Sequence, residues 1–257
     1  MPRGRWFSLG WLGIAVLASG AQVAQAQTAA NPLKVKPVLE LFTSQGCSSC
    51  PPADALIKSY VDGHKVIALS MPVDYWDYLG WKDSLASPKF SERQRAYAKT
   101  RGDNQVYTPQ VVVNGVTHVN GSHKRDIDQA ILETEKKLRA LQVPLRAWID
   151  GDTLKVEAGN VASGATVKEA TLWLAVMKPE VEVAIRRGEN SGRKVTYSNV
   201  VSDWSQLGTW TGRKVVFERD VKTMSKSATC AVLLQVGKSG PIIGAAEIES
   251  GREAAAN

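Results

Sequence analysis

The chain has 257 residues, long enough for one large domain or two modest ones. Lys and Arg number 32 against 25 Asp and Glu, which gives a formal net charge of +7, and the excess is spread over both halves of the chain. No basic block is dense enough to indicate nucleic-acid binding, so we exclude nucleic acid as a partner and interpret the mild basicity as a solubility feature.

The first 26 residues are typical of a secretory signal peptide. Two arginines precede a short apolar stretch, and Ala24-Gln25-Ala26 matches an Ala-x-Ala cleavage site. We predict a signal peptide over residues 1–26 and a mature protein in the periplasm or outside the cell. An uncleaved membrane anchor is the alternative, but glycines interrupt the apolar stretch. No later stretch is long and apolar enough to cross a bilayer, so we expect no stable membrane insertion after the signal is removed.

The cysteine motif lies between a predicted strand and a predicted helix. Residues 36–44, KPVLELFTS, are apolar and β-prone, and residues 53–61, ADALIKSYV, have apolar side chains at helical spacing. A second apolar run, residues 65–73, follows the helix. A strand, a helix and a strand in this short space predict a βαβ unit with a parallel pair of strands.

Residues 74–90 form an aromatic segment that has two interpretations. It contains Tyr75, Trp76, Tyr78 and Trp81 among several aspartates. The first interpretation places these rings in the core, which we favour for most of them and for Trp81 in particular. The second has them line a groove beside the cysteines that binds peptide substrates, because interfaces are enriched in aromatic residues. We expect Tyr75 or Trp76 to lie near such a groove and to bind substrate.

Two more helices and a hairpin complete the first part of the chain. A capping-box pattern opens a short helix over residues 92–100. The apolar repeat over residues 127–141 predicts a longer helix. Between them, residues 109–122 are predicted to form two strands around Asn114-Gly115, a dipeptide suited to a tight type I′ turn.

The pattern changes at Pro144. Helical periods stop, and strand-like runs separated by turn residues follow, among them EATLWLAVM, VEVAIRR and RKVTYSNVV. About seven short strands in roughly 105 residues predict an antiparallel β-sandwich over residues 143–250. We expect a disordered tail at residues 251–257. Cys230 lies in an apolar strand and is expected to be a small buried residue.

Cys47 and Cys50, three positions apart, have several interpretations. In an exported protein a close pair of cysteines tends to form a disulfide, whereas the cytosol would favour thiols or zinc. Only one further cysteine is present, so a single chain cannot bind zinc through four thiolates. A redox-active pair, an inert staple and a Cu(I) site remain open, the last because soft thiolates select Cu(I) and Met71 could fold close to the pair.

The first part of the chain resembles the thioredoxin superfamily, and its local sequence is most similar to glutaredoxin-like members. LFTSQGCSSC stands where that superfamily has a strand and its active-site turn, and YTPQVVVNG stands where it has a Thr/Val-Pro, a strand and a hairpin. The resemblance implies an α/β fold class: a thioredoxin-like domain over residues 36–142, followed by an all-β sandwich-like domain over residues 143–250.

Nearly all of the mature chain is similar to a more specific group. These are secreted bacterial proteins with a thioredoxin-like domain and an appended β domain, catalogued as a domain of unknown function. The matching motifs are ELFTSQGCSSCPPAD, VDYWDYLGWKD, RQRAYA, YTPQVVVNG and RGENSGRKVTYSNVV. One position departs from the pattern. Pro72 stands where we expect a histidine, so any tuning of the dithiol by that histidine is absent from this chain.

The resemblance assigns roles to individual residues. Cys47 is expected to be the more exposed, attacking cysteine and Cys50 its resolving partner. Pro109 is expected to follow a cis peptide bond, which leaves the backbone of Thr108 free to pair with an extended substrate segment.

Thiolate chemistry depends on the start of the helix and on a proton acceptor. A helix N-terminus favours an anion. Because a residue before proline avoids the α region, we expect Cys50 and Pro51 to be non-helical and the helix to begin near Pro52. Glu40, on the first strand, and Asp74, at the end of the second, are candidate proton relays. The position of Glu40 is offset by one residue from the expected spacing, which would turn it to the other face of its strand.

These features predict an exported thiol–disulfide oxidoreductase that uses Cys47 and Cys50, with no cofactor. Its expected partners are protein or peptide thiols and disulfides, together with a redox partner protein. The alternatives are a non-catalytic envelope binding module with a structural disulfide and a copper-handling protein. A disulfide that closes so small a ring constrains little of the unfolded chain, and this favours redox use.

Overall fold

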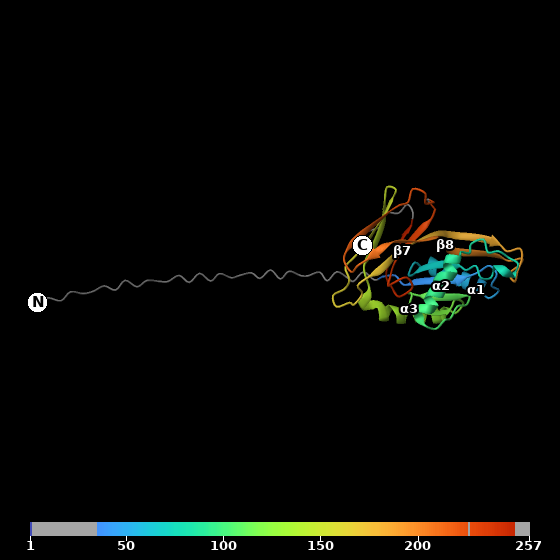
Figure 1. Ribbon diagram of the computed structural model, residues 1–257, viewed down its shortest axis with the longest axis horizontal. Helices are drawn as coiled ribbons and strands as arrows, with labels where there is room; N and C mark the ends of the chain where they lie inside the picture. The colour runs from blue at the N-terminus through green and yellow to red at the C-terminus, as the bar shows by residue number, and fades with distance from the viewer. Residues whose placement is uncertain (2–34, 226, 250–257) are drawn as a thin grey trace. The chain divides into compact units, whose positions relative to one another are not determined.

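The computed structural model describes Met1, residues 35–225 and residues 227–249 (Figure 1). The predicted signal peptide, residues 1–26, and the predicted tail, residues 251–257, lie outside the described residues. Among the helices that are described, none is both long enough and apolar enough to span a membrane.

The first part of the chain alternates strands with helices. In chain order the elements are β1 (Val38–Thr43), α1 (Pro51–Asp62), β2 (Ile67–Pro72), the 3₁₀ turn η1 (Asp77–Leu79), α2 (Pro88–Arg101), β3 (Gln110–Val113), β4 (Thr117–Asn120), α3 (Lys124–Leu138) and the 3₁₀ turn η2 (Arg139–Leu141). The predicted helices and the predicted hairpin are therefore present.

The described residues that follow contain strands and no helix. They are β5 (Leu145–Asp150), β6 (Thr153–Ala158), β7 (Ala170–Ala184), β8 (Lys194–Trp210), β9 (Val215–Asp220), β10 (Thr229–Gln235) and β11 (Ile242–Glu249). The change in pattern predicted at Pro144 is confirmed.

The described strands form two sheets. The larger has eight strands in the order β11-β10-β7-β8-β2-β1-β3-β4, and the smaller has three in the order β5-β6-β9. The β1–β2 pair is parallel, as predicted, and β3 pairs with the other edge of β1 in the antiparallel direction. Strands β7 and β8 have 15 and 17 residues and run side by side as an antiparallel pair (Figure 1).

The predicted fold class, a thioredoxin-like domain followed by a β-sandwich-like domain, is wrong. The described residues are mostly β, with eleven strands and three α-helices, and the large mixed sheet contains strands from both parts of the sequence. The junction is the β2–β8 pair. There Ser70 Oγ donates to the backbone oxygen of Ser198 at 2.7 Å, and Asn199 Nδ2 donates to that of Ala68 at 3.1 Å. Because β8 pairs with β2, strands β7, β10 and β11 extend the first sheet and do not form a sandwich by themselves.

Side chains alternate between the two faces of β1, as they must in a strand. Leu39 and Leu41 belong to a buried apolar cluster with residues of α1 and α3. Val38 and Phe42 belong to another cluster, with residues of α2, β8 and β10. Glu40 shares the face of Val38 and Phe42, so it faces α2 and lies on the opposite side of β1 from α1.

The β3–β4 turn joins the hairpin to the second part of the chain. Asn114 and Gly115 have φ angles of 51° and 66°, as the predicted type I′ turn requires. The backbone N–H of Ile242 donates to the backbone oxygen of Asn114 at 2.8 Å. A Cβ added to Gly115 would lie 2.3 Å from the backbone oxygen of Gly240, so this close approach also requires glycine.

Candidate redox site

Residues 44–50, which we call the cysteine turn, connect β1 to α1. Cys47 and Cys50 form a disulfide with their Cα atoms 5.4 Å apart, and the N–H of Cys50 donates to the backbone oxygen of Cys47 at 3.1 Å. Cys50 is the N-cap of α1, with φ −79° and ψ −36°, and the helix begins at Pro51. The expected non-helical Cys50 and Pro51 are wrong, because the hydrogen-bonded turn holds Cys50 in the helical region despite the proline that follows; the helix begins one residue before the expected start near Pro52.

The disulfide is buried. Cys47 exposes 1% of its surface and Cys50 exposes 0%, while Ser48 and Ser49 between them are exposed. The expectation that Cys47 is exposed is wrong. Its place in a turn before a helix suggested access to solvent, but two segments that are distant in sequence pack against the cysteine turn.

The first of these segments is the connection between β7 and β8, residues 185–193, which we call the arginine loop. Its Asn190 is 1% exposed. Asn190 Nδ2 donates to the backbone oxygens of Gln45 at 3.0 Å and Cys47 at 2.8 Å. Asn190 Oδ1 is buried and has no hydrogen-bond partner among the described residues. One side chain from the second part of the sequence therefore fixes the backbone on which Cys47 lies.

The second covering segment is the aromatic segment. Trp81 Nε1 donates to Gln45 Oε1 at 2.7 Å, and Asp83 Oδ2 accepts the backbone N–H of Gln45 at 2.8 Å. Trp76 lies against Gly46, where an added Cβ would be 3.0 Å from the Cβ of Trp76. The expected place of Trp81 in the core is wrong, because its half-buried ring lies against the cysteine turn.

The peptide bond between Thr108 and Pro109 is cis, as predicted. Trp76 Nε1 donates to Thr108 Oγ1 at 2.9 Å, so this tryptophan connects Thr108 to the cysteine turn. Pro109 is also close to the start of α1, because a Cβ added to Gly121 would lie 3.1 Å from Ala53 Cβ and 3.2 Å from Pro109 Cβ. Trp76, Thr108 and Pro109 therefore lie near the segment that carries the two cysteines.

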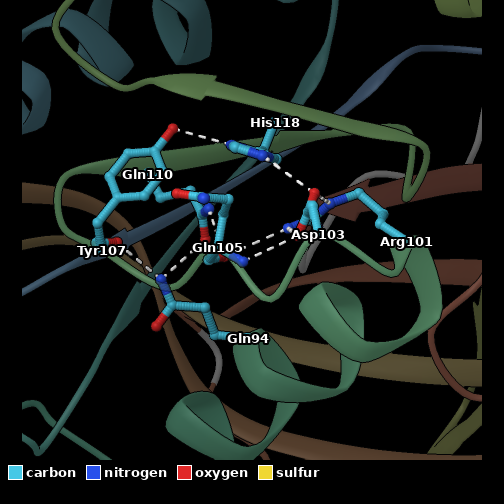
Figure 2. A network of polar contacts seen from close by, with 7 residues as sticks. All are labelled: Gln94, Arg101, Asp103, Gln105, Tyr107, Gln110 and His118. Atoms are coloured by element: carbon cyan, nitrogen blue, oxygen red, sulfur yellow. Dashed lines mark hydrogen bonds and ion pairs between the residues drawn. The ribbon is translucent and has the colours of Figure 1, made fainter.

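The backbone around Pro109 is held by a polar network (Figure 2). Gln94 of α2 donates from Nε2 to the backbone oxygen of Tyr107 at 2.8 Å and to Gln110 Oε1 at 2.9 Å, so it holds the chain on both sides of the cis bond. Tyr75 OH donates to Gln94 Oε1 at 3.2 Å. Tyr75 therefore supports the segment that would bind substrate, through Gln94.

The same network continues through β4 (Figure 2). Tyr107 OH and His118 Nδ1 are 2.9 Å apart, and His118 Nε2 lies 3.2 Å from Asp103 Oδ2. Hydrogen bonding to Arg101 lowers the pKa of Asp103 to about 2. Partial burial, together with the charge of Arg101, lowers the pKa of His118. His118 is therefore held in place by Tyr107 and Asp103, and it is largely neutral at pH 7.

Asp54 was not predicted as a site residue, yet it is the buried acid closest in sequence to the disulfide. It lies in the first turn of α1, is 1% exposed, and its N–H donates to the backbone oxygen of Cys50 at 3.1 Å. Oδ1 accepts the hydroxyl of Thr43 at 2.8 Å, and the buried Oδ2 has no partner among the described residues. Burial raises the pKa of Asp54 to about 8, and the charge of Asp83 adds to the rise. The sequence feature that could have identified Asp54 is an acidic residue within the apolar face of a predicted helix, four positions after Cys50.

Glu40 and Asp74, the predicted proton relays, are bonded to α2. Glu40 is fully buried, pairs with Arg93 Nε at 2.6 Å and accepts a hydrogen bond from the hydroxyl of Tyr97. Asp74 accepts a hydrogen bond from the hydroxyl of Ser91. These bonds connect β1 and the segment that follows β2 to α2, and none of them involves the cysteine turn.

Met71 and Cys230 lie in apolar surroundings. Met71 is fully buried in the cluster that contains Phe42. Cys230 is 1% exposed and its Sγ donates to Met224 Sδ at 3.2 Å, which confirms that it is a buried residue. Burial raises the pKa of Cys230 to about 11. In the part of the chain that the structure describes, no group of three or more His, Cys, Asp or Glu is placed to hold a metal ion.

Comparisons with known proteins identify the family of this chain and a similar solved structure. The family model described as "Protein of unknown function (DUF1223)" matches residues 38–235. The chain is similar to protein AGR_C_4864 from Agrobacterium tumefaciens, whose X-ray crystal structure superimposes with a TM-score of 0.75 at 34% sequence identity, over 87% of this chain and 98% of that one. No curated protein matches the chain.

Proposed function

This chain belongs to the DUF1223 family, whose function is unknown, and we propose that it is a thiol–disulfide oxidoreductase that acts through the Cys47–Cys50 disulfide. The observation that carries the proposal is the position of this disulfide at the start of α1, four residues before a buried carboxyl whose pKa is near neutral. A helix start favours a thiolate, and a group with a pKa near the working pH exchanges protons efficiently.

The exchange balances as two successive displacements. A substrate thiolate attacks the sulfur of Cys47, a new sulfur–sulfur bond forms, the Cys47–Cys50 bond breaks, and Cys50 leaves as a thiolate that takes up a proton. A second substrate thiol attacks the mixed disulfide and releases an oxidised substrate and reduced Cys47. Two substrate thiols thus give two electrons and two protons to the protein, and the reverse sequence reduces a substrate disulfide.

Asp54 is the proposed proton donor and acceptor for Cys50. It shares the first turn of α1 with Cys50, and side chains four positions apart lie on one face of a helix. Its Oδ2 has no hydrogen-bond partner among the described residues, so this oxygen is available to a thiol. With a pKa of about 8, Asp54 is protonated in most molecules at neutral pH and can supply the proton that the departing thiolate of Cys50 needs.

The burial of the disulfide adds a requirement to this mechanism. A substrate sulfur must approach the sulfur of Cys47, which is 1% exposed. The arginine loop or the aromatic segment must therefore move before exchange. The bonds that would break come from a few side chains, namely Asn190 in the arginine loop and Trp81 and Asp83 in the aromatic segment.

The proposed substrates are thiols and disulfides of proteins or peptides, and the proposed location is the periplasm or the outside of the cell. The substrate class is supported by Thr108 and Pro109, which lie near the segment that carries the two cysteines, on a backbone held by Gln94. A strand, a cysteine turn and a helix beside a cis proline are the local features on which the resemblance to thioredoxins rests. The location is supported by the signal-like sequence of residues 1–26.

A second candidate function is a binding module with a structural disulfide, and the burial of both cysteines favours it. Serine variants separate the two. In Cys50→Ser the remaining Cys47 should form a mixed disulfide with a disulfide-bonded peptide probe, and thermal unfolding should show that the variant is folded. The double variant, with Cys47→Ser added, is the control. If the folded Cys50→Ser protein captures no probe, the oxidoreductase proposal fails and the structural role stands.

A further inference from the structure

A groove of about 470 Å³ begins next to the disulfide. Pro51, Ala55 and Lys58 line one side, and they occur on one face of α1 at helical spacing. Residues 193–196, where the arginine loop passes into β8, line the other side. Pro51 directly follows Cys50, so one end of this groove, which we call the basic groove, lies at the redox site.

The charged side chains that line the basic groove are all cations. They are Lys58, Arg193 and Lys194, and all three residues are exposed. Nearby carboxylates pair with the lysines but do not line the groove: Asp62 lies 3.0 Å and Glu180 3.9 Å from Lys58 Nζ, and Glu182 lies 2.7 Å from Lys194 Nζ.

Arg193 differs from the two lysines. Within the described residues it forms no ion pair, so its guanidinium is available to an anion from solution. Its backbone N–H donates to the backbone oxygen of Asn190 at 3.1 Å. Asn190 in turn holds the backbone of Cys47. The unpaired cation and the residue that fixes the cysteine turn therefore belong to one short turn of the arginine loop.

We infer that the basic groove binds the carboxylate of an acidic peptide and so presents a neighbouring thiol or disulfide of that peptide to Cys47 and Cys50. Arginine binds carboxylates through two parallel hydrogen bonds, and its charge draws anions from a distance. Pro51, Ala55 and Val195 offer an apolar surface to the rest of the peptide. This inference rests on the proposed function and adds to it the charge of the substrate.

The test is a binding measurement that needs no exchange. Two fluorescent peptides carry serine in place of cysteine, flanked by glutamates in one and by lysines in the other, and binding to the oxidised full chain is followed by anisotropy at low salt. We expect the acidic peptide to bind at least about tenfold more tightly than the basic one and to lose affinity as salt is added. Equal affinities would overturn the inference.

A pair of variants locates the effect. Arg193→Gln should weaken binding of the acidic peptide by about fivefold or more, since a charged hydrogen-bonding partner is lost. The matched control is Arg213→Gln. Arg213 follows the last residue of the 17-residue strand β8, whereas Arg193 precedes the first, so this substitution should change the affinity by less than about twofold. Equal effects of the two substitutions would contradict binding of the acidic peptide in the basic groove.

The outcomes distinguish this inference from the function on which it rests. If the serine peptides bind as expected but Cys47 captures no thiol from the matching cysteine peptides, the proposed function fails. If exchange occurs at equal rates with acidic and basic cysteine peptides, and Arg193→Gln changes neither rate, the oxidoreductase stands and the acidic-substrate inference is overturned.

Discussion

The side-chain amide of Asn190 donates a hydrogen bond of 2.8 Å to the backbone oxygen of Cys47, across 143 residues of sequence. Because the donor lies on the arginine loop and the acceptor on the cysteine turn, the second part of the chain contributes directly to the candidate redox site. It covers the disulfide and fixes the backbone that carries it. In the proposed mechanism, the access of a thiol to Cys47 therefore depends on this loop.

Asn190→Ala should make the disulfide easier to reduce in the folded protein. The substitution removes two hydrogen bonds to the cysteine turn, and two bonds of roughly 1 kcal/mol each correspond to an increase of about tenfold or more in the open population. The rate of reduction by dithiothreitol under native conditions measures this. The control is Asn160→Ala, since Asn160 accepts one exposed backbone N–H, from Lys214. An unchanged rate for Asn190→Ala would show that the arginine loop does not limit access.

Asp54→Asn should flatten the dependence of stability on pH. Burial raises the pKa of Asp54 from 3.8 to about 8, so between these values the folded protein holds a proton that the unfolded chain has released. The free energy of unfolding then falls as pH rises, by at most about 1.4 kcal/mol per pH unit for this group. Burial also raises the pKa of Asp83, so this group makes the free energy of unfolding fall further as pH rises.

Denaturant unfolding at pH 5 and pH 8, with the disulfide intact, measures this effect. The variant should lose less stability than the wild type between the two values. Asp150→Asn is the control, because Lys155 lowers the pKa of Asp150 and this group therefore titrates below the window. An identical loss in the wild type and in Asp54→Asn would mean that Asp54 is ionised throughout.

Glu40→Gln should destabilise the protein without changing the pH profile of thiol exchange. The substitution leaves the guanidinium of Arg93 buried without its carboxylate, and breaking a buried pair in this way costs roughly 3–5 kcal/mol. Glu157→Gln, which breaks a partly exposed pair with Lys214, should cost less than about 1 kcal/mol. If Glu40→Gln instead left stability unchanged and shifted the pH profile, Glu40 would be the proton relay that the sequence indicated.

Gly115→Ala tests the junction between the hairpin and the second part of the chain. Its new Cβ would meet the backbone oxygen of Gly240, whereas Gly151 also has a positive φ but open space around it. Gly151→Ala should cost about 1 kcal/mol from backbone conformation alone, and Gly115→Ala should cost at least about 1–2 kcal/mol more. Thermal or denaturant unfolding of the two variants gives the comparison. Equal costs would mean that the turn does not pack against Gly240.

Local structure in this protein follows from local sequence. The apolar spacing of residues 53–61 predicted α1, and Asn114-Gly115 predicted its turn, since each depends on neighbours in the chain. The parallel β1–β2 pair and the close approach of Pro109 to the start of α1 followed from the order of elements and from the family resemblance.

The error in fold class arose from contacts between distant segments. The run EATLWLAVM and the run VEVAIRR were predicted as separate strands, but β7 continues through Pro179 while its register passes from Lys178–Val200 to Glu180–Ser198. Beside that point Asn199 has a φ of 47° and donates its side chain to β2. Whether a strand edge is free or paired depends on such side chains, and no periodicity reveals it.

The burial of the cysteines could not be predicted for the same reason. Asn190 and Trp81 cover the cysteine turn from loops whose sequences carry no sign of their partners. The choice of Glu40 instead of Asp54 as the buried acid near the disulfide has a simpler cause. Glu40 points to α2, and Asp54 was overlooked because aspartate is unexpected on the buried face of a helix.

The most direct test is a redox titration of the full chain in graded glutathione buffers, followed by quenching, denaturation, alkylation and intact-mass analysis. Cys230 contributes one alkyl group to every sample, and reduction of Cys47 and Cys50 adds two more. The proposed function predicts a single reversible transition within roughly −320 to −120 mV, the range of cellular thiol buffers and thiol oxidoreductases. A disulfide that stays intact in the most reducing buffer, while the unfolded chain is readily reduced, would contradict it.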